Sequence, residues 1–370
     1  MSFYDICNQY EDFNVQNFFR AIDTQTIQKS LNASNVSAHQ FLSLLSSKAE
    51  PFLEQMATQS YSLTRQYFGK TIQLYTPMYV SNYCDNECIY CGFNRTNKIQ
   101  RKKLSLDEVA KEAQFISQTG LKHILLLTGS SRVQSSVGYV KECVKILKKY
   151  FSSISLEIYT LTTDEYKELI DAGVDGLTVY QEVYDKTIYS QVHRAGPKTD
   201  YLFRLNAPER ALVKKMRTVN IGVLLGLSSW QKEVFLLGLH AQYLQDKFFD
   251  SEISISLPRL RPAQGEFQPV CVVTDKNIVQ MILAFRIFLP RVGITLSTRE
   301  SPEFRENVLP LGVTRMSAGS TTQVGGHTAI VDENRPSAQF EISDKRDVSE
   351  MITLLERKGY QPVLKDWMAI

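Results

Sequence analysis

Hydrophobic and polar positions follow different patterns on the two sides of residue 70. Residues 1–70 are rich in Gln, Ser and Leu without a repeated strand pattern, which predicts a mostly helical segment. From Thr71 onward, short β-branched or aromatic runs alternate with amphipathic helical stretches. These runs predict eight strands, at residues 72–80, 123–128, 154–159, 176–181, 220–227, 252–258, 293–298 and 313–318.

Helix boundaries fall between these runs, where a strand–helix–strand order needs them. Ser105 with Glu108, and Thr162 with Glu165, have the spacing of capping boxes, and Gly173 supplies a helix stop. Continuous apolar strands separated by helices indicate a parallel sheet that is buried on both faces. Eight such strands favour a closed (β/α)8 barrel over an open doubly wound sheet.

The chain of 370 residues is therefore expected to be an α/β protein with a single TIM-type barrel. We expect a helical N-terminal extension over residues 1–70, the barrel over 71–320, and a short C-terminal closing segment over 321–370 that packs on the barrel. An amphipathic pattern predicts a helix over 346–358 in that last segment.

Composition excludes several classes of function. With 43% hydrophobic residues, 22% charged residues and a net charge of +3, neither disorder nor a nucleic-acid partner is indicated. The apolar stretches are far shorter than the ~20 residues of a membrane span, and the first residues lack a secretory signal. We expect a cytoplasmic protein without a membrane partner. The interrupted basic run at 98–103 predicts a solvated face.

Three of the six cysteines crowd into one short stretch, Cys84-x3-Cys88-x2-Cys91, directly after the first predicted strand. This clustering favours metal or catalytic use over a disulfide framework. Structural zinc sites usually have four ligands, and the nearest histidines in the sequence are His123 and His193. Three thiolates suit a [4Fe–4S] cluster, because one iron then stays open for a substrate or cofactor. A non-catalytic binding protein stabilised by zinc, with a distant histidine as fourth ligand, is the alternative.

The spacing of the cysteines resembles the signature of the radical S-adenosylmethionine (SAM) superfamily. That resemblance implies that SAM binds the open iron and is cleaved to methionine and a 5′-deoxyadenosyl radical. It also implies that Tyr90 packs on the adenine. The superfamily commonly has an acidic residue after the glycine that ends the second strand, whereas here Ser130 and Ser131 follow Gly129. Backbone carbonyls near Gly129 are then expected to meet the SAM amino group.

Further stretches resemble the 2-iminoacetate synthase family, from about residue 70 to the C-terminus. They are VYQEVY (179–184), SLPRLRP (256–262), LSTRESP (296–302), SAGS (317–320) and PVLKDW (362–367). The resemblance implies cleavage of the Cα–Cβ bond of L-tyrosine to 2-iminoacetate (dehydroglycine) and 4-cresol, for thiazole formation in thiamine biosynthesis. It also implies thiazole synthase as a partner and a reductant of the flavodoxin or ferredoxin type.

The same resemblance assigns roles to residues at or beyond the carboxyl ends of the predicted strands. Glu157 and Glu182 are expected at the ribose and amino groups of SAM, and Arg204 and Arg259 at a carboxylate of SAM or of the substrate. Arg299 follows the seventh strand, where a guanidinium can clamp a substrate carboxylate; a rim ion pair with Glu300 or Glu303 is the alternative. The small residues expected to complete the amino-acid site are Ser297, Ser317 and Ser320.

Two related activities stay open. A tyrosine lyase of the hydrogenase-maturation type is expected to carry a C-terminal extension with further cysteines, and here no cysteine follows Cys271. A lyase acting on tryptophan is the other, because the sequence does not reveal the width of the pocket.

Overall fold

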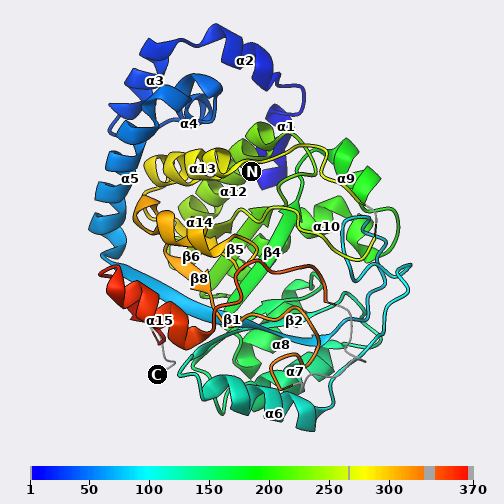
Figure 1. The fold of residues 1–370 in the computed structure, drawn as a ribbon. Helices are drawn as coiled ribbons and strands as arrows, with labels where there is room; N and C mark the ends of the chain where they lie inside the picture. The colour runs from blue at the N-terminus through cyan, green and yellow to red at the C-terminus, as the bar shows by residue number, and fades with distance from the viewer. Residues whose placement is uncertain (1, 266, 329–337, 366–370) are drawn as a thin grey trace.

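Eight parallel strands close into a barrel in the computed structural model, which describes residues 2–265, 267–328 and 338–365. β1 pairs with β2 on one side and with β8 on the other, and these pairings close the ring (Figure 1). The strands are β1 (Thr71–Ser81), β2 (His123–Thr128), β3 (Ser153–Glu157), β4 (Gly176–Glu182), β5 (Thr218–Val223), β6 (Glu252–Ser256), β7 (Gly293–Leu296) and β8 (Arg315–Ser317). The predicted (β/α)8 fold and its eight strands are confirmed.

Five of the eight predicted strands run too far at their carboxyl ends. β5 ends at Val223 and β6 at Ser256, four and two residues earlier than the hydrophobic pattern indicates. The pattern continues because the residues that follow, such as Leu224 and Leu257, are buried around a cavity although they have left the sheet. Burial and strand geometry therefore end at different residues.

Helices surround the barrel between successive strands. They are α6 (Leu106–Ser117), α7 (Val137–Leu147), α8 (Thr163–Ala172), α9 (Lys186–Val192), η2 (Pro197–Thr199), α10 (Tyr201–Leu205), α11 (Ala207–Val213), α12 (Trp230–Lys247), α13 (Asp275–Phe288), α14 (Pro302–Asn307) and η3 (Leu309–Leu311). Both predicted capping boxes are present, at Ser105 before α6 and at Thr162 before α8. Gly173 ends α8 with a φ of 122°, a conformation that favours glycine.

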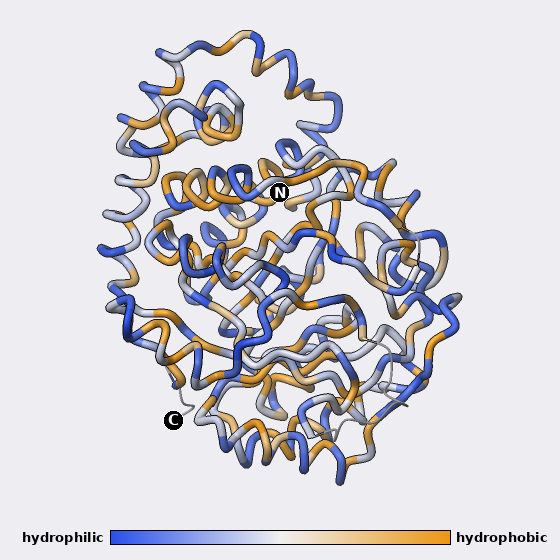
Figure 2. Tube along the Cα trace, viewed as in Figure 1, coloured by the Kyte–Doolittle hydropathy of each residue, from blue (hydrophilic) through white to orange (hydrophobic). Residues whose placement is uncertain are grey.

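Residues 3–68 contain six helices that pack on one side of the barrel. They are α1 (Phe3–Gln9), α2 (Val15–Ala21), α3 (Thr24–Leu31), α4 (Ala38–Leu44), η1 (Ser47–Phe52) and α5 (Leu53–Phe68), and Figure 1 shows α4 and α5 beside α13. Phe41 stacks on Phe288 with ring centroids 4.4 Å apart. A Cβ at Gly238 would lie 2.3 Å from the Phe41 ring, so α12 needs a glycine there. These helices share one hydrophobic core with the barrel, where hydrophobic and more polar residues alternate along the tube in Figure 2.

The C-terminal residues return to the first strand. α15 (Val348–Arg357) lies within the predicted helix, and β9 (Gln361–Val363) then pairs parallel to β1. β9 was not predicted, because three residues that include Pro362 carry no alternating pattern; a proline suits an edge strand. Asp366 and Trp367, the end of the tail motif, lie outside the described residues.

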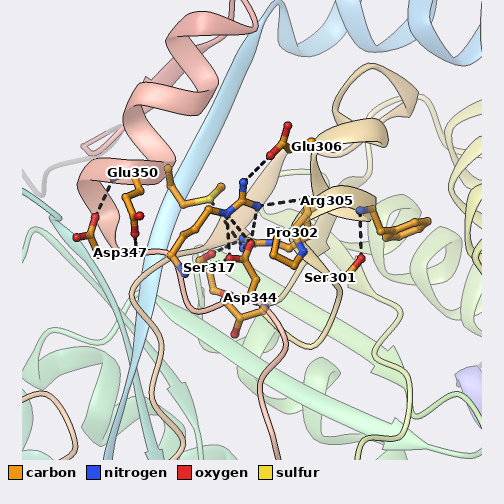
Figure 3. Close-up of polar contacts among 12 residues, drawn as sticks. Ser301, Pro302, Arg305, Glu306, Ser317, Asp344, Asp347 and Glu350 are labelled. Carbon is orange, nitrogen blue, oxygen red and sulfur yellow. Dashed lines mark hydrogen bonds and ion pairs between the residues drawn. The ribbon is translucent and has the colours of Figure 1, made fainter.

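A buried ion-pair network connects this C-terminal part to the carboxyl end of the barrel (Figure 3). The side chains of Arg305 and Asp344 are fully buried and form an ion pair, and Arg305 also donates to the Ser317 carbonyl. Arg346 binds Asp344 at 2.6 Å and Glu306 at 2.8 Å. The network holds the end of β8, and Ser317 with it, in place.

Within the described residues, the longest apolar helical stretch falls short of what a membrane crossing requires.

Candidate active site

The cysteine loop leaves β1 at the carboxyl end of the barrel, as predicted, and Arg101 holds it together. The Arg101 guanidinium donates to the backbone carbonyls of Asn82, Phe93 and Asn94 at 2.6–2.9 Å. The expectation of a solvated basic face is therefore wrong for Arg101, because three consecutive basic residues do not reveal which one turns inward.

The three cysteines are free thiols, with Cys88 buried and Cys84 and Cys91 half-buried. Asn86 Nδ2 lies 3.7 Å from Cys84 Sγ, and Gln339 Nε2 lies 3.7 Å from Cys91 Sγ. Burial raises the pKa of Cys88 to about 12, and burial and the negative charge of Cys84 raise the pKa of Cys91. Thiolates become the stable form there only beside a cationic centre such as a metal cluster.

The donor set of the cysteine loop suits an iron–sulfur cluster. The irons of such a cluster are held by cysteine sulfurs, and the loop offers three of them. Three thiols on one loop, with amide donors aimed at two of the sulfurs, therefore fit a [4Fe–4S] cluster.

Gly129 brings the end of β2 against the cysteine loop. Its N–H donates to the Ser81 carbonyl at 2.7 Å, and a Cβ would lie only 2.2 Å from the Tyr83 carbonyl oxygen. Ser130 follows this glycine, where the superfamily commonly has an acidic residue. Its backbone carbonyl accepts the Asp85 N–H at 3.0 Å. Residues 129–130 therefore support the cysteine loop through their backbone.

Glu182 ends β4 in an uncommon backbone conformation, with a φ of 71°. The pairing register with β5 shifts between Tyr180 and Glu182. The carboxylate lies 2.7 Å from Lys198 Nζ and 3.5 Å from an Arg204 nitrogen. Such strain costs about 1–3 kcal/mol and is concentrated at functional sites.

The Tyr90 hydroxyl bonds His193 Nε2 at 2.8 Å and Lys198 Nζ at 2.9 Å. Burial raises the pKa of Tyr90 well above its usual value, so the phenol stays protonated. Burial, with the charges of Lys198 and Arg204, lowers the pKa of His193 to about 2, so that imidazole is neutral. Tyr90 is thus a fixed wall of the site.

Two adjacent cavities are lined by eight of the thirteen predicted site residues, and the five that line neither are Cys84, Cys88, Gly129, Arg204 and Arg259. The cluster-side cavity is lined by Tyr90, Cys91, Glu157, Tyr180, Glu182, Leu224, Pro258, Leu260, Arg261, Arg299, Gln339 and Phe340. The lumen cavity lies deeper and includes Tyr75, Tyr79, Glu157, Ser297, Arg299, Ser317 and Ser320. Glu157 and Arg299 line both cavities, so the two cavities are adjacent, and Cys91 and Arg299 face the same cluster-side cavity.

Glu157 occupies the junction between the cavities, at the end of β3. Burial, and then the negative charge of Glu182, raise the pKa of Glu157 to about 7, although Arg299 opposes the shift. Its carboxyl group therefore changes charge near neutral pH.

Arg299 is available to a ligand. Its guanidinium lies over the Phe340 ring, 3.4 Å from the centroid, and donates to the Arg259 carbonyl at 3.3 Å. Across the described ranges no carboxylate forms an ion pair with it, and Glu300 is bound by Arg259 instead. Among the described residues, Arg299 thus forms no ion pair with Glu300 or Glu303, which was the alternative to a role in binding the substrate.

The three predicted serines differ in their contacts. Ser297 Oγ accepts the Arg299 N–H at 3.3 Å, and Ser317 Oγ accepts the Thr298 N–H at 3.0 Å. Ser320 Oγ is buried without a hydrogen-bond partner among the described residues. All three line the lumen cavity, and Ser320 has the unused hydrogen-bonding capacity that a ligand can meet.

Of the two arginines in the SLPRLRP stretch, Arg261 lines a cavity, whereas Arg259, the predicted site residue, does not. Arg259 pairs with Glu300 and with Asp275, at 2.7 Å from the latter, and lines neither cavity. Arg261 lines the cluster-side cavity, and its Nε has no partner within the described residues. Sequence reasoning missed Arg261, although it belongs to the same motif.

A larger cavity of about 520 Å³ opens at the amino ends of the strands, between residues such as Thr71, Thr218 and Gly293. Barrel enzymes place their chemistry at the carboxyl ends, so its size does not make it the active site.

Comparison with known proteins identifies the family. The Radical SAM superfamily model matches residues 78–237, and the model of the Biotin and Thiamin Synthesis associated domain matches residues 256–361. The 2-iminoacetate synthases of Escherichia coli (strain K12) and Salmonella typhimurium are each 38% identical to this chain, over 92% of it and 90% of their own length. This chain belongs to the 2-iminoacetate synthase family. As a radical SAM member of that family it is a carbon–carbon lyase, and the superfamily implies a [4Fe–4S] cluster and SAM.

A solved structure supports the same fold for this 2-iminoacetate synthase family member. The FeFe-hydrogenase maturase HydG from Carboxydothermus hydrogenoformans is 31% identical, with a TM-score of 0.86 over 98% of this chain and 83% of that one. The alternative of a zinc-stabilised binding protein without catalysis loses its support, because the relatives are enzymes.

Proposed function

We propose that this enzyme cleaves the Cα–Cβ bond of L-tyrosine to 2-iminoacetate and 4-cresol, with SAM converted to methionine and 5′-deoxyadenosine, for thiazole formation in thiamine biosynthesis. The observation that carries the proposal is the cluster-side cavity, which Cys91 of the cysteine loop and Arg299 both line. Family membership supplies the reaction type, and Arg299 supports an amino acid as the substrate.

Cys84, Cys88 and Cys91 would hold the cluster, and Glu157, Glu182 and the backbone near Gly129 would hold SAM. When bound and reduced, the cluster supplies the electron that splits SAM into methionine and the 5′-deoxyadenosyl radical. The residues of the chain bind and orient. Tyr90 forms one wall of the cluster-side cavity, and the bulge in β4 directs Glu182 toward it.

The charges around the cavities favour two carboxylate groups. Lys198, Arg204, Arg261 and Arg299 are four cations, and Glu157 and Glu182 are two carboxylates, which leaves an excess of two positive charges when both carboxylates are ionised. SAM and an amino acid each bring one carboxylate that these cations can bind.

The substrate would lie in the lumen cavity. Arg299 would clamp its carboxylate with two parallel hydrogen bonds, while Ser297, Ser317 and Ser320 offer further polar contacts. The walls include Tyr75, Tyr79 and Tyr180, whose rings suit an aromatic side chain.

Product analysis tests the proposal. The enzyme, reconstituted without oxygen, is incubated with SAM, a reductant and either tyrosine or tryptophan, and mass spectrometry follows 5′-deoxyadenosine, 4-cresol and glyoxylate, the hydrolysis product of the iminoacetate. We expect all three products from tyrosine. Deoxyadenosine without cresol would defeat the tyrosine assignment and leave the radical mechanism in place.

The similarity to HydG favours one second candidate, a tyrosine lyase of the hydrogenase-maturation type. Assaying the same incubation for carbon monoxide and cyanide as well distinguishes the two, since that activity converts the two-carbon fragment to these products.

The proposed partners are thiazole synthase and an acidic one-electron donor of the flavodoxin or ferredoxin type, in the cytoplasm. The clustering of three cysteines within eight residues favours metal use over a disulfide framework, which suits a reducing compartment. Affinity purification of the tagged holoenzyme, probed with purified thiazole synthase and flavodoxin, tests both partners, and cell fractionation tests the location.

A further inference from the structure

Lys198, a cation that no sequence motif singled out, bridges the cysteine loop and the end of β4. Its Nζ donates to Glu182 Oε1 at 2.7 Å and to the Tyr90 hydroxyl at 2.9 Å. The side chains of Lys198 and Glu182 are only 12% and 10% exposed, so little solvent screens the ion pair. One ammonium group therefore joins two residues that line the cluster-side cavity from different elements.

The backbone of Lys198 is anchored on the cysteine loop. Its N–H donates to Asn86 Oδ1 at 2.8 Å, and its carbonyl accepts the Tyr189 hydroxyl at 2.6 Å. Two residues earlier, Gly196 has a φ of 95°, and a Cβ there would lie 2.4 Å from the Asp85 carbonyl oxygen. The Lys198 side chain thus reaches Glu182 from a backbone segment that is anchored on the cysteine loop.

Hydrogen-bond directions make Tyr90 an acceptor for this lysine. His193 Nδ1 lies 2.8 Å from the Tyr189 carbonyl, which can only accept, so the proton of the neutral ring is on Nδ1. His193 Nε2 then accepts the Tyr90 hydroxyl proton at 2.8 Å, and the lone pairs of that oxygen face Lys198. The hydrogen bonds that connect His193, Tyr90, Lys198 and Glu182 can therefore form with only one assignment of donors and acceptors: Lys198 donates to Glu182 and Tyr90, and Tyr90 donates to His193.

We propose that Lys198 is a positioning residue for SAM binding, which holds the Glu182 carboxylate and the Tyr90 ring in one fixed arrangement beside the cysteine loop. This inference rests on the proposed function, in which these two residues contact SAM. The strained backbone of Glu182 adds weight, since a conformation with a φ of 71° persists only where the surroundings hold it. Arg204, at 3.5 Å, is too distant to replace the short contact from lysine.

Lys198→Met tests the inference in the anaerobically reconstituted holoenzyme, with SAM itself as the probe. We expect normal iron content, a Kd for SAM raised about tenfold or more, and loss of the change that SAM causes in the EPR spectrum of the reduced cluster. Lys198→Arg should recover part of the affinity, because the charge returns. Lys186→Met is the matched control: Lys186 also bonds a carboxylate, Glu11, and faces the Tyr4 ring, but lies outside the cavities.

Three results would overturn the inference. The first is a SAM affinity and EPR change in Lys198→Met equal to those of the wild type. The second is loss of iron from that variant, which would mean that the lysine supports the cysteine loop alone. If Lys198→Met does not fold, Tyr90→Phe takes its place, because it removes only the hydroxyl that the lysine contacts. The third overturning result is SAM binding by Tyr90→Phe that equals that of the wild type. Wild-type enzyme that holds iron but binds no SAM would instead refute the proposed function.

Discussion

Gly129→Ala tests how closely the end of β2 supports the cysteine loop. The new methyl group would lie 2.2 Å from the Tyr83 carbonyl oxygen, whereas ordinary contact begins at 3.4 Å, so the loop must retreat by about 1.2 Å. The backbone of Gly129 is not in the left-handed region, so alanine itself is not strained. Metal–ligand distances tolerate only about 0.2 Å of error. We therefore expect this variant to lose cluster binding.

The assay is iron and sulfide per chain after anaerobic reconstitution, together with the thermal midpoint of the apo protein. Wild type should hold about four irons and Gly129→Ala less than half of that. Gly138→Ala on α7 is the matched control, because its nearest neighbour is a side-chain oxygen at 3.8 Å; it should keep all its iron and gain up to about 1 kcal/mol of stability. Four irons and an unchanged midpoint in Gly129→Ala would refute the reasoning.

Three further changes probe the site and its support. Arg299→Met should raise KM for the amino acid about tenfold or more, because a charge-assisted clamp is lost, and an unchanged KM would exclude contact with the substrate. The pKa of Glu157 is raised to about 7 from 4.5, so the stability that its protonated carboxyl contributes is complete below pH 4.5 and is lost as pH rises through 7. Between pH 5 and pH 8, the free energy of unfolding of the apo wild type, measured by denaturant titration, should therefore fall by up to about 3 kcal/mol more than that of Glu157→Gln. Equal losses in the two proteins would contradict the shift. Asp344→Asn should lower the free energy of unfolding by about 3–5 kcal/mol, because it leaves the buried Arg305 unpaired. Lys141→Met, which breaks an exposed ion pair with Glu168, should lower it by less than about 1 kcal/mol. Similar losses in the two variants would mean that burial does not set the contribution of these ion pairs to stability.

The barrel was predictable because its signals are local. Each strand is a short apolar run, and Ser105 and Thr162 mark helix starts within four residues of their partners. β9 has no such signal, since Gln361–Val363 becomes a strand only through pairing with β1. The carboxyl ends of β5 and β6 were overextended because the residues beyond them are buried around a cavity.

The site was predictable where chemistry depends on spacing. Cys84, Cys88 and Cys91 are recognised from three positions in one loop, and Arg299 from its place after a strand. Lys198 and Arg261 were not, because the role of a cation depends on which atoms from distant elements surround it. For Lys198 those atoms belong to Glu182 and Tyr90, which lie 16 and 108 residues away.

The most direct test of the central claim follows one carbon. Tyrosine labelled with ¹³C at Cβ is turned over anaerobically with SAM and a reductant, and mass spectrometry locates the label in the products. Cleavage between Cα and Cβ predicts that all the label appears in the methyl group of 4-cresol and that the two-carbon fragment is unlabelled. Label in the two-carbon fragment, or labelled tyrosine returned unchanged while deoxyadenosine accumulates, would contradict the account.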